Sequence, residues 1–459
     1  MELSRRAKRF TIVATILGSS IVFVDGTVVN VALPAIQSDL GGGLATQQWV
    51  VDAYLLTLGS LILLGGSLGD IYGEVRMFTI GVASFGVVSA LCAAAPDSTT
   101  LIVCRGLQGV AGALLTPSSL AILTATFSGT ERGAAIGTWT AWTGISTVIG
   151  PLLGGWLIGL WSWRAIFLIN VPVALATLVF TLREVPRVSG GRKGVRVDYP
   201  GATLCAAGLG SLVFGFIEQP QRGWADALVI GTITLGIALL VVFVLYEARA
   251  PQPMLPLRLF ANRNFSATNL ETFAVYGGLS ALGFLLSLFL QQVAGWSPLQ
   301  AGLATVPVTI VMFLLSRRAG GWSMRLGPRW FMTAGPALAG LGALALARLP
   351  TDPSYAADLL PALILFALGL SLTVAPLTTT VLSEAGPGDA GIASGVNNAV
   401  ARVAGLLAVA VIGVVAAGGA SNLTASGYRD AMMVTAALLF AGGAIGAVGI
   451  RNPSAAGIR

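Results

Sequence analysis

Apolar stretches long enough to cross a lipid bilayer follow one another along almost the whole chain. A helix needs about 20 residues to span the hydrocarbon region of a membrane. We therefore expect fourteen transmembrane helices, at 10–33, 49–69, 77–96, 100–122, 134–159, 163–182, 200–218, 226–247, 265–290, 299–317, 329–348, 359–382, 391–418 and 430–450. The segments at 200–218 and 299–317 fit least well, so twelve helices is the main alternative.

The polar connections between these segments carry nearly all of the basic residues, and their distribution predicts the orientation of the chain. With both termini in the cytoplasm, the outer connections hold only Arg164, Arg222, Arg348 and Arg429, and the inner side holds the other basic residues that lie outside the spans. Cytoplasmic loops of membrane proteins are enriched in Lys and Arg. The pattern predicts an even number of crossings, cytoplasmic termini and a first helix that stays in place as a signal anchor.

Composition agrees with an all-helical integral membrane protein. The chain has 459 residues, of which 55% are hydrophobic and only 10% charged; soluble domains have roughly 25% charged residues. The 59 glycines fit helices that approach one another closely. The net charge of +7 does not indicate nucleic-acid binding, because the basic residues lie in short loops and form no patch.

Cysteine and histidine usage argues against an enzyme or a metal centre. Cys92, Cys104 and Cys205 lie in apolar segments without the spacing of metal ligands, and the chain has no His. The sequence also shows no nucleophile together with a general base, the arrangement that many enzymes use. The glycine-rich run GSLGDIYG lacks the spacing and the Lys-Ser/Thr of a phosphate-binding loop, so ATP is not expected. We expect no cofactor and no metal.

Two polar connections, 183–200 and 247–264, divide the chain into three parts. We predict a six-helix bundle at 1–182, two inserted helices with basic linkers at 183–264, and a second six-helix bundle at 265–459. A faint internal repeat agrees, since GGSLGDIYGEVR (65–76) resembles GGWSMRLGPR (320–329) and each follows the second helix of its half. Such a duplication is typical of secondary transporters.

A few ionisable residues lie within the predicted spans. A carboxylate at the centre of a membrane helix costs about 2.5–3.5 kcal/mol, and such residues usually mark ion or substrate paths. Asp25 and Arg105 lie at a similar depth in the outer third, and Asp52 lies near the outer start of its helix. Depth alone suggests that these three form a cluster open to the outside. In the second half Glu271 is the carboxylate well inside a span. A structural, hydrogen-bonded role for each remains open.

Six motifs, in order along nearly the whole chain, resemble the major facilitator superfamily, and specifically its fourteen-helix drug:proton antiporter branch. They are DGTVVNVALP (25–34), GSLGDIYGEVR (66–76), RGLQGVAGA (105–113), GPLLGG (150–155), WRAIFLINVP (163–172) and DYPGA (198–202). The resemblance implies two six-helix bundles with two inserted helices between them.

The resemblance also assigns roles to residues. It implies proton coupling by Asp25, Arg105, Glu271 and Asp52, a gating motif of Gly66, Asp70, Gly73 and Arg76, and an antiporter motif of Gly150, Pro151, Gly154 and Gly155. Ile71 and Glu74 stand where the gating motif usually has basic residues, and Met324 stands where its second copy would carry an acid. A charge-based gate at Asp70 should therefore be weak, with Arg76 as the nearest basic residue.

Polar residues with small neighbours form stripes on two further helices. Arg105, Gln108, Gly109 and Gly112 share one face of their helix by spacing, as do Gly391, Ser394, Gly395, Asn398, Arg402 and Gly405. Such stripes are typical of helix interfaces and also of substrate paths. Candidates for either role are Asn30, Gln108, Asn398 and Arg402.

The function expected from these observations is proton-coupled export of lipophilic small molecules or drugs, including cationic ones, by alternating access. Asp25, with Glu271, would be deprotonated when substrate is captured inside and protonated from outside for release. The expected energy source is the proton gradient, the expected location a bacterial plasma membrane, and the expected active form a monomer. The alternatives are export of one metabolite, antibiotic, amino acid or lipid on the same fold, and a sensor that transports nothing.

Overall fold

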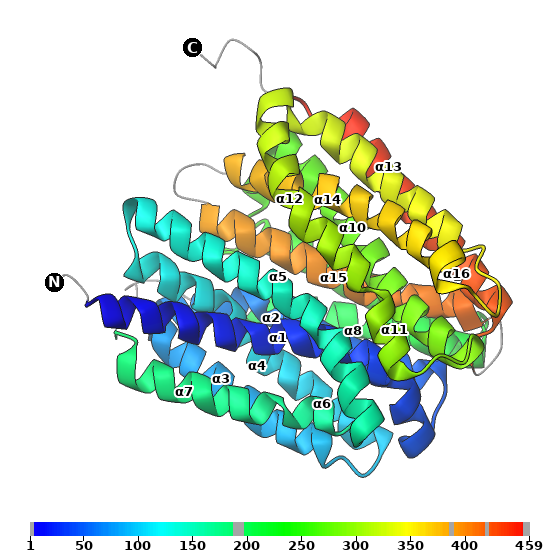
Figure 1. The fold of residues 1–459 in the computed structure, drawn as a ribbon. Helices are drawn as coiled ribbons and strands as arrows, with labels where there is room; N and C mark the ends of the chain where they lie inside the picture. The colour runs from blue at the N-terminus through cyan, green and yellow to red at the C-terminus, as the bar shows by residue number, and fades with distance from the viewer. Residues whose placement is uncertain (1–3, 187–196, 385–389, 418–421, 453–459) are drawn as a thin grey trace. The chain divides into compact units, whose positions relative to one another are not determined.

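The computed structural model describes residues 4–186, 197–384, 390–417 and 422–452, and helices account for most of them (Figure 1). The α-helices are α1 (Arg5–Leu40), α2 (Leu44–Tyr72), α3 (Glu74–Ala93), α4 (Ser98–Thr126), α5 (Gly129–Leu160), α6 (Ala165–Leu168), α7 (Asn170–Glu184), α8 (Tyr199–Arg222), α9 (Ala227–Glu247), α10 (Arg263–Leu288), α11 (Pro298–Ala304), α12 (Val306–Leu326), α13 (Pro328–Leu346), α14 (Leu360–Ser383), α15 (Ala390–Ala417) and α16 (Ala425–Gly449). Most of the predicted basic loop, residues 187–196, lies outside the described residues.

The described helices match the predicted membrane spans closely. Thirteen of them are long and apolar enough to cross a membrane. The two weakest predicted segments lie within α8 and within α11 and α12, both of which meet this measure. The remaining predicted span, 329–348, is α13, a 19-residue helix with Arg329 in its first turn, Pro336 inside it and several glycines. The membrane-protein class and the all-helical fold are therefore confirmed.

The chain folds into two compact units. The N-terminal unit contains Met1–Gly215, Ala225–Leu255 and Ser297–Leu303, and the C-terminal unit contains Phe216–Trp224, Pro256–Trp296 and Ala304–Arg459. The core of the N-terminal unit is formed by apolar side chains of α1 to α4 and α7, among them Val22, Leu58, Phe78, Phe85 and Leu115. Most of the α8–α9 hairpin groups with this unit.

Helix packing inside the two units follows the same scheme, which is the structural counterpart of the faint sequence repeat. In the N-terminal unit, α2 and α3 pack on α4, α1 packs on α5 and α7, and α3 packs on α7. In the C-terminal unit, α12 and α13 pack on α14, α10 packs on α15 and α16, and α13 packs on α16. Helices α8 and α9 have no counterpart in this scheme.

The two repeated segments also end their helices in the same way. Gly73 has a φ of 94° and joins α2 directly to α3, and Gly327 has a φ of 85° and joins α12 directly to α13. A positive φ of this kind strains any residue with a Cβ atom. One glycine therefore makes each turn, and the predicted gating-motif Gly73 has a clear conformational role.

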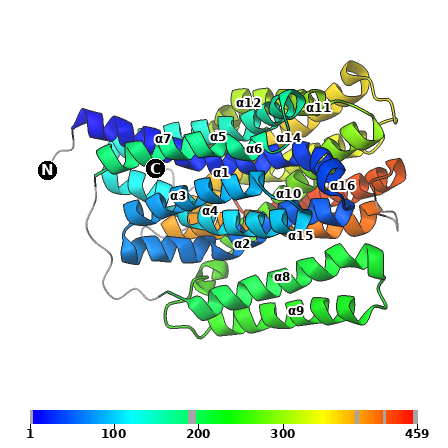
Figure 2. The ribbon, with the colours of Figure 1, turned by 90° about the horizontal axis from the view of Figure 1, so that it is seen from below.

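Helices α8 and α9 form an antiparallel hairpin (Figure 2). A Cβ atom on Gly208 would lie 2.9 Å from Leu240 Cγ, and one on Gly236 would lie 2.7 Å from Leu212 Cγ, so both glycines allow close packing. Asp198 accepts the N–H of Gly201 at 2.9 Å and that of Met254 at 3.4 Å. Asp198, just before the hairpin, is thus hydrogen-bonded to Met254, just after it.

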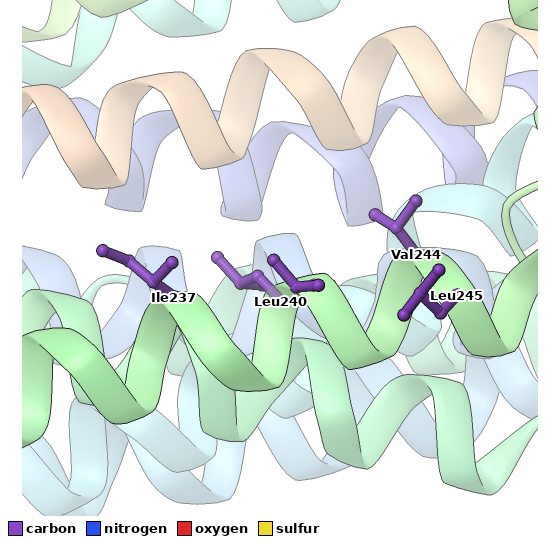
Figure 3. A pocket seen from close by; sticks show the side chains of 5 residues that line it. Ile237, Leu240, Val244 and Leu245 are labelled. Atoms are coloured by element: carbon purple, nitrogen blue, oxygen red, sulfur yellow. The ribbon is translucent and has the colours of Figure 1, made fainter.

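Much of the surface of α9 is apolar and exposed. Ile237, Leu240, Val241, Val244 and Leu245 line a shallow depression of about 400 Å³ along it (Figure 3). A second depression, of about 390 Å³, lies between α2 and α8 and is also mostly apolar. Neither contains an ionisable residue other than Tyr199 at one end of the second. Such surfaces fit the hydrocarbon of the bilayer rather than a polar site.

Close packing of α4 on α2 gives a testable consequence. A Cβ atom on Gly109 would overlap the carbonyl oxygen of Tyr54 and Thr57 Oγ1, whereas one on Gly106, in the preceding turn, would lie 3.9 Å from the nearest atom, Ala53 O. Because backbone cannot yield as a side-chain tip does, we expect Gly109→Ala to destabilise the fold by about 1–3 kcal/mol. The matched control, Gly106→Ala, should leave stability nearly unchanged. Thermal unfolding of the purified variants in detergent measures both, and equal melting temperatures would contradict the packing.

Candidate functional site

The N-terminal unit contains a buried ion pair between α1 and α4. Asp25 Oδ2 accepts a charge-assisted hydrogen bond from Arg105 Nη1. The Asp25 side chain is fully buried and that of Arg105 is 1% exposed. Sequence reasoning placed these two residues at a similar depth, and the structure brings them into contact.

The position of Arg105 follows from where α4 begins. Asp97 is the N-cap of α4, and its carboxylate accepts the backbone N–H of Thr100 at 2.8 Å and its hydroxyl at 2.9 Å. The backbone hydrogen bond from Thr100 holds the pKa of Asp97 below its usual range, as expected at a helix N-terminus. Arg105 then lies two turns into the helix, about 10 Å from its start at 1.5 Å per residue.

Arg105 has several partners besides Asp25. Its Nε donates to the backbone carbonyl of Val50 on α2 at 3.0 Å, and Nη1 donates to Gln108 Oε1 at 2.7 Å. The guanidinium also lies 4.4 Å from the ring centroid of Tyr54 and 5.7 Å from that of Phe167. Stacked aromatic faces stabilise a cation in a desolvated site. The charge of Arg105 is therefore held by α2, α4 and the Phe167 segment even before Asp25 is counted.

The second oxygen of Asp25 accepts hydrogen bonds from two neutral amides. Gln108 Nε2 lies 3.2 Å and Asn170 Nδ2 3.0 Å from Asp25 Oδ1. Both amides also donate to Ser89 Oγ on α3, at 2.8 Å and 3.3 Å. We call these five residues (Asp25, Ser89, Arg105, Gln108 and Asn170) the Asp25 network. It provides the Asp25 carboxylate with three donors, one of them a cation.

Sequence reasoning found part of this network and missed the rest. It singled out Asp25, Arg105 and Gln108 but gave no role to Ser89 or Asn170. The available signal for Asn170 was the motif WRAIFLINVP, of which it is a part. Asp52, the third expected member, is fully buried, yet neither of its carboxylate oxygens has a hydrogen-bond partner among the described residues. The structure therefore does not join Asp52 to the other two.

The antiporter motif lies in α5 where it packs against α1. A Cβ atom on Gly150 would lie 3.0 Å from Val24 O, and one on Gly154 would lie 2.7 Å from Val28 Cγ2, so these glycines let α5 approach the α1 backbone beside Asp25. Gly155 faces another way, toward the backbone of Pro298 and Leu299. Pro151 lies inside α5. Two glycines of the motif thus allow α5 to pack closely on α1, the helix that carries Asp25.

The gating motif occupies the connection between α2 and α3. Gly66 lies in α2 beside α4, where a Cβ atom on this glycine would lie 3.7 Å from Pro117 Cβ, and Gly73 makes the turn described above. Within the part of the chain that the structure describes, neither Asp70 nor Arg76 forms an ion pair. A gate based on charge at this loop stays a prediction.

In the C-terminal unit, Glu271 is fully buried in α10 and has no hydrogen-bond partner among the described residues. Ala267 and Ala274 flank it on the same helical face, and they lie against Gly449 and Gly442 of α16. Glu271 thus lies on the face of α10 that packs on α16. Its environment differs from that of Asp25, which has three donors, one of them a cation.

In the polar stripe of α15, the residue that bonds to α10 is Asn397, a neighbour of the candidate Asn398. Asn398 is exposed in this unit, whereas its neighbour Asn397 donates to Thr272 Oγ1 at 2.7 Å and to Asn269 Oδ1 at 3.2 Å on α10. Arg402, half-buried, lies close enough to Tyr276 for its charge to act there. In the other unit, Asn30 is half-buried on α1, five residues after Asp25 and on another face.

Comparison with known proteins gives relatives over most of the chain. The family model of the Major Facilitator Superfamily matches residues 15–409. The puromycin resistance protein of Streptomyces alboniger is 37% identical over 411 residues, which cover 89% of this chain and 81% of that protein. The cephamycin export protein of Amycolatopsis lactamdurans is 36% identical over 431 residues, covering 92% and 88%.

Solved structures give the same fold at low identity. A peptide transporter in complex with sulfate superimposes with a TM-score of 0.70 at 14% identity, covering 96% of this chain and 93% of that one. An inward-facing bacterial homologue of the lysosomal transporter Spinster superimposes with a TM-score of 0.68 at 17% identity, covering 97% of both. With the family match and the bacterial relatives, the chain is a multi-pass plasma-membrane protein that belongs to the major facilitator superfamily of transporters.

Proposed function

We propose that this transporter is a proton-coupled exporter of lipophilic small molecules, in the fourteen-helix drug:proton antiporter branch of the superfamily. Its relatives are named for resistance to puromycin and for export of cephamycin, and others for tetracenomycin C and multidrug resistance. The α8–α9 hairpin between the two repeated units supports the fourteen-helix branch. The order of the six motifs supports antiport.

The observation that carries the coupling proposal is the Asp25 network. A fully buried carboxylate with three donors, one of them an arginine, is stable when ionised and becomes neutral when it takes up one proton. Protonation removes the charge that holds Arg105. Arg105 has other partners besides this carboxylate, namely the Val50 carbonyl, Gln108 Oε1 and the Tyr54 ring.

The two states of Asp25 act on the transport cycle through α1. Asp25 is fully buried in this conformation, so it does not bind the cargo directly here. Helix α1 packs on α5 through Gly150 and Gly154. A change in the electrostatic attraction between Arg105 and Asp25 would therefore shift α1 against α5. Each proton that enters the cell supplies about 2.3 kcal/mol per 100 mV of membrane potential. One or two protons per cycle suffice for useful export.

Neutralising Asp25 should uncouple transport from the proton gradient. We expect Asp25→Asn to lower pH-gradient-driven ethidium transport in proteoliposomes by about tenfold or more, because the amide cannot exchange a proton at this site. The matched control is Glu218→Gln, which changes a partly exposed carboxylate on α8 that pairs with Arg222 one turn away. It should transport as the unmodified protein does. Intact coupling in Asp25→Asn would remove Asp25 from the mechanism.

Glu271 is the rival proton carrier and gives an opposite expectation. No donor or cation stabilises an ionised Glu271 among the described residues, so the isosteric, neutral Gln replaces its uncharged form closely. We expect Glu271→Gln to retain pH-gradient-driven ethidium transport within about twofold. A loss as large as that of Asp25→Asn would make Glu271 a coupling residue too. The measurement uses the same proteoliposomes and gradient.

The breadth of the cargo range separates drug export from export of one compound. In a bacterial host without its own efflux pumps, we expect the protein to lower the accumulation of several unrelated lipophilic compounds, including ethidium and puromycin, and an uncoupler to restore it. Asp25→Asn serves as the inactive control. Export of a single compound from the panel would favour the specific-exporter alternative. Binding without movement of ligand or protons would favour a sensor.

A further inference from the structure

The motif WRAIFLINVP contributes Asn170 to the Asp25 network, and its other residues connect this network to the surface of the unit. Trp163 lies in the turn before α6, Phe167 lies within α6, and Asn170 is the first residue of α7. The rings of Trp163 and Phe167 meet edge to face, with centroids 6.1 Å apart at 89°. Each of the three contacts a residue of the N-terminal unit that carries charge.

The N-terminal end of the motif, Trp163 and Arg164, is fixed near the surface. Trp163 Nε1 donates to Asp39 Oδ2 at 2.9 Å, and Arg164 pairs with the same carboxylate. Arg164 also donates to the carbonyl of Ala95 at 3.2 Å, in the connection between α3 and α4. The segment is therefore bound to the end of α1, the helix that carries Asp25, and to the connection that leads into α4, the helix that carries Arg105.

The other end of the segment reaches the buried carboxylate. Asn170 is 2% exposed, and its amide nitrogen donates one hydrogen bond to Asp25 Oδ1 at 3.0 Å and one to Ser89 Oγ at 3.3 Å. An amide nitrogen has two N–H groups, so this geometry uses both. Gln108 also donates to Asp25, but its own oxygen accepts from Arg105. Asn170 therefore acts on Asp25 by a route that does not pass through the arginine.

We propose that Asn170 is a positioning residue for Asp25: its amide holds the ionised carboxylate and so sets the pH at which the site exchanges its proton. The role rests on the proposed function, in which Asp25 carries the coupled proton. A neutral donor favours the charged form of a carboxylate by a moderate amount. It adjusts proton affinity without adding the charge of a second cation.

The ionisable groups around Asp25 support a simple interpretation of a pH experiment. Arg105 faces it from α4, the thiol of Cys92 on α3 donates to Gln108 Oε1 at 3.3 Å, and Tyr54 of α2 lies against Arg105. Helix α5 approaches through the glycine contacts described above, and α7 contributes the uncharged Asn170. Arg105 is thus the charged group in direct contact with Asp25 among the described residues, and Asn170→Ala leaves that contact in place.

The test follows the proton on Asp25 directly, without relying on transport. Infrared spectra of the full chain in lipid, recorded across a pH series, contain the C=O band of protonated Asp25, identified by its loss in Asp25→Asn. We expect Asn170→Ala to move the midpoint of this band up by about 0.5–1 pH unit. Asn170→Ser, which keeps a shorter donor, should give a smaller shift and serves if the alanine variant folds poorly.

A matched control separates positioning from general structural damage. Thr177→Val changes a buried polar residue on the same face of α7 whose hydroxyl donates to Val173 O at 2.7 Å, and it should leave the midpoint unchanged. An unshifted midpoint in both Asn170 variants, or an equal shift in Thr177→Val, overturns the proposal.

Transport measurements then show whether the titration serves coupling. The acid limb of the pH profile of ethidium transport should move with the infrared midpoint in Asn170→Ala, and Asn170→Ala should add nothing further in an Asp25→Asn background. If the unmodified protein shows no pH-gradient-driven transport while the infrared shift is present, the proposed function fails and the positioning role of Asn170 stands. If transport is coupled but the midpoint does not shift, the proposed function stands and the positioning role of Asn170 fails.

Discussion

The N-terminal unit is organised around two opposite charges buried inside a membrane protein. Transferring a carboxylate or a guanidinium from water to such an interior costs several kcal/mol each, and the attraction between them compensates only when further hydrogen bonds satisfy the remaining atoms. Asp25 and Arg105 meet this condition because α2, α3, α4 and α7 each contribute a polar atom, and aromatic rings lie over the cation. The pair therefore constrains the position of every helix around it.

The two units share a packing scheme but treat buried charge differently. In the N-terminal unit the carboxylate on the first helix has an arginine and two amides beside it. In the C-terminal unit, Glu271 is buried on the corresponding helix α10, with no donor among the described residues. Duplication thus preserved the arrangement of helices while the polar chemistry became specific to one unit. This asymmetry is why Asp25 is the stronger candidate for an exchangeable proton.

The sequence predicted the membrane class, the spans and the pairing of Asp25 with Arg105, because hydropathy and helix depth follow directly from residue order. It did not predict which way each residue points around its helix axis. Asp52 has a suitable depth but does not join the pair, and Asn397 rather than Asn398 bonds to α10, a difference of one position along the helix. Asn170 was missed because it begins a helix directly after a break, where periodicity gives no face. Ser89 was missed because a lone serine in a membrane helix is common.

The inserted hairpin shows how such a fold accepts extra helices. Asp198 binds the backbone of Met254, so the polypeptide returns to the place where it left after crossing twice. Because the hairpin crosses the membrane twice, the helices after it keep the same orientation. Because its two ends are bonded to each other, the hairpin adds no length to the connection between the two repeats. The sequence and the lipid-facing surface of the hairpin can therefore diverge without changing the orientation of the helices that precede and follow it in the chain.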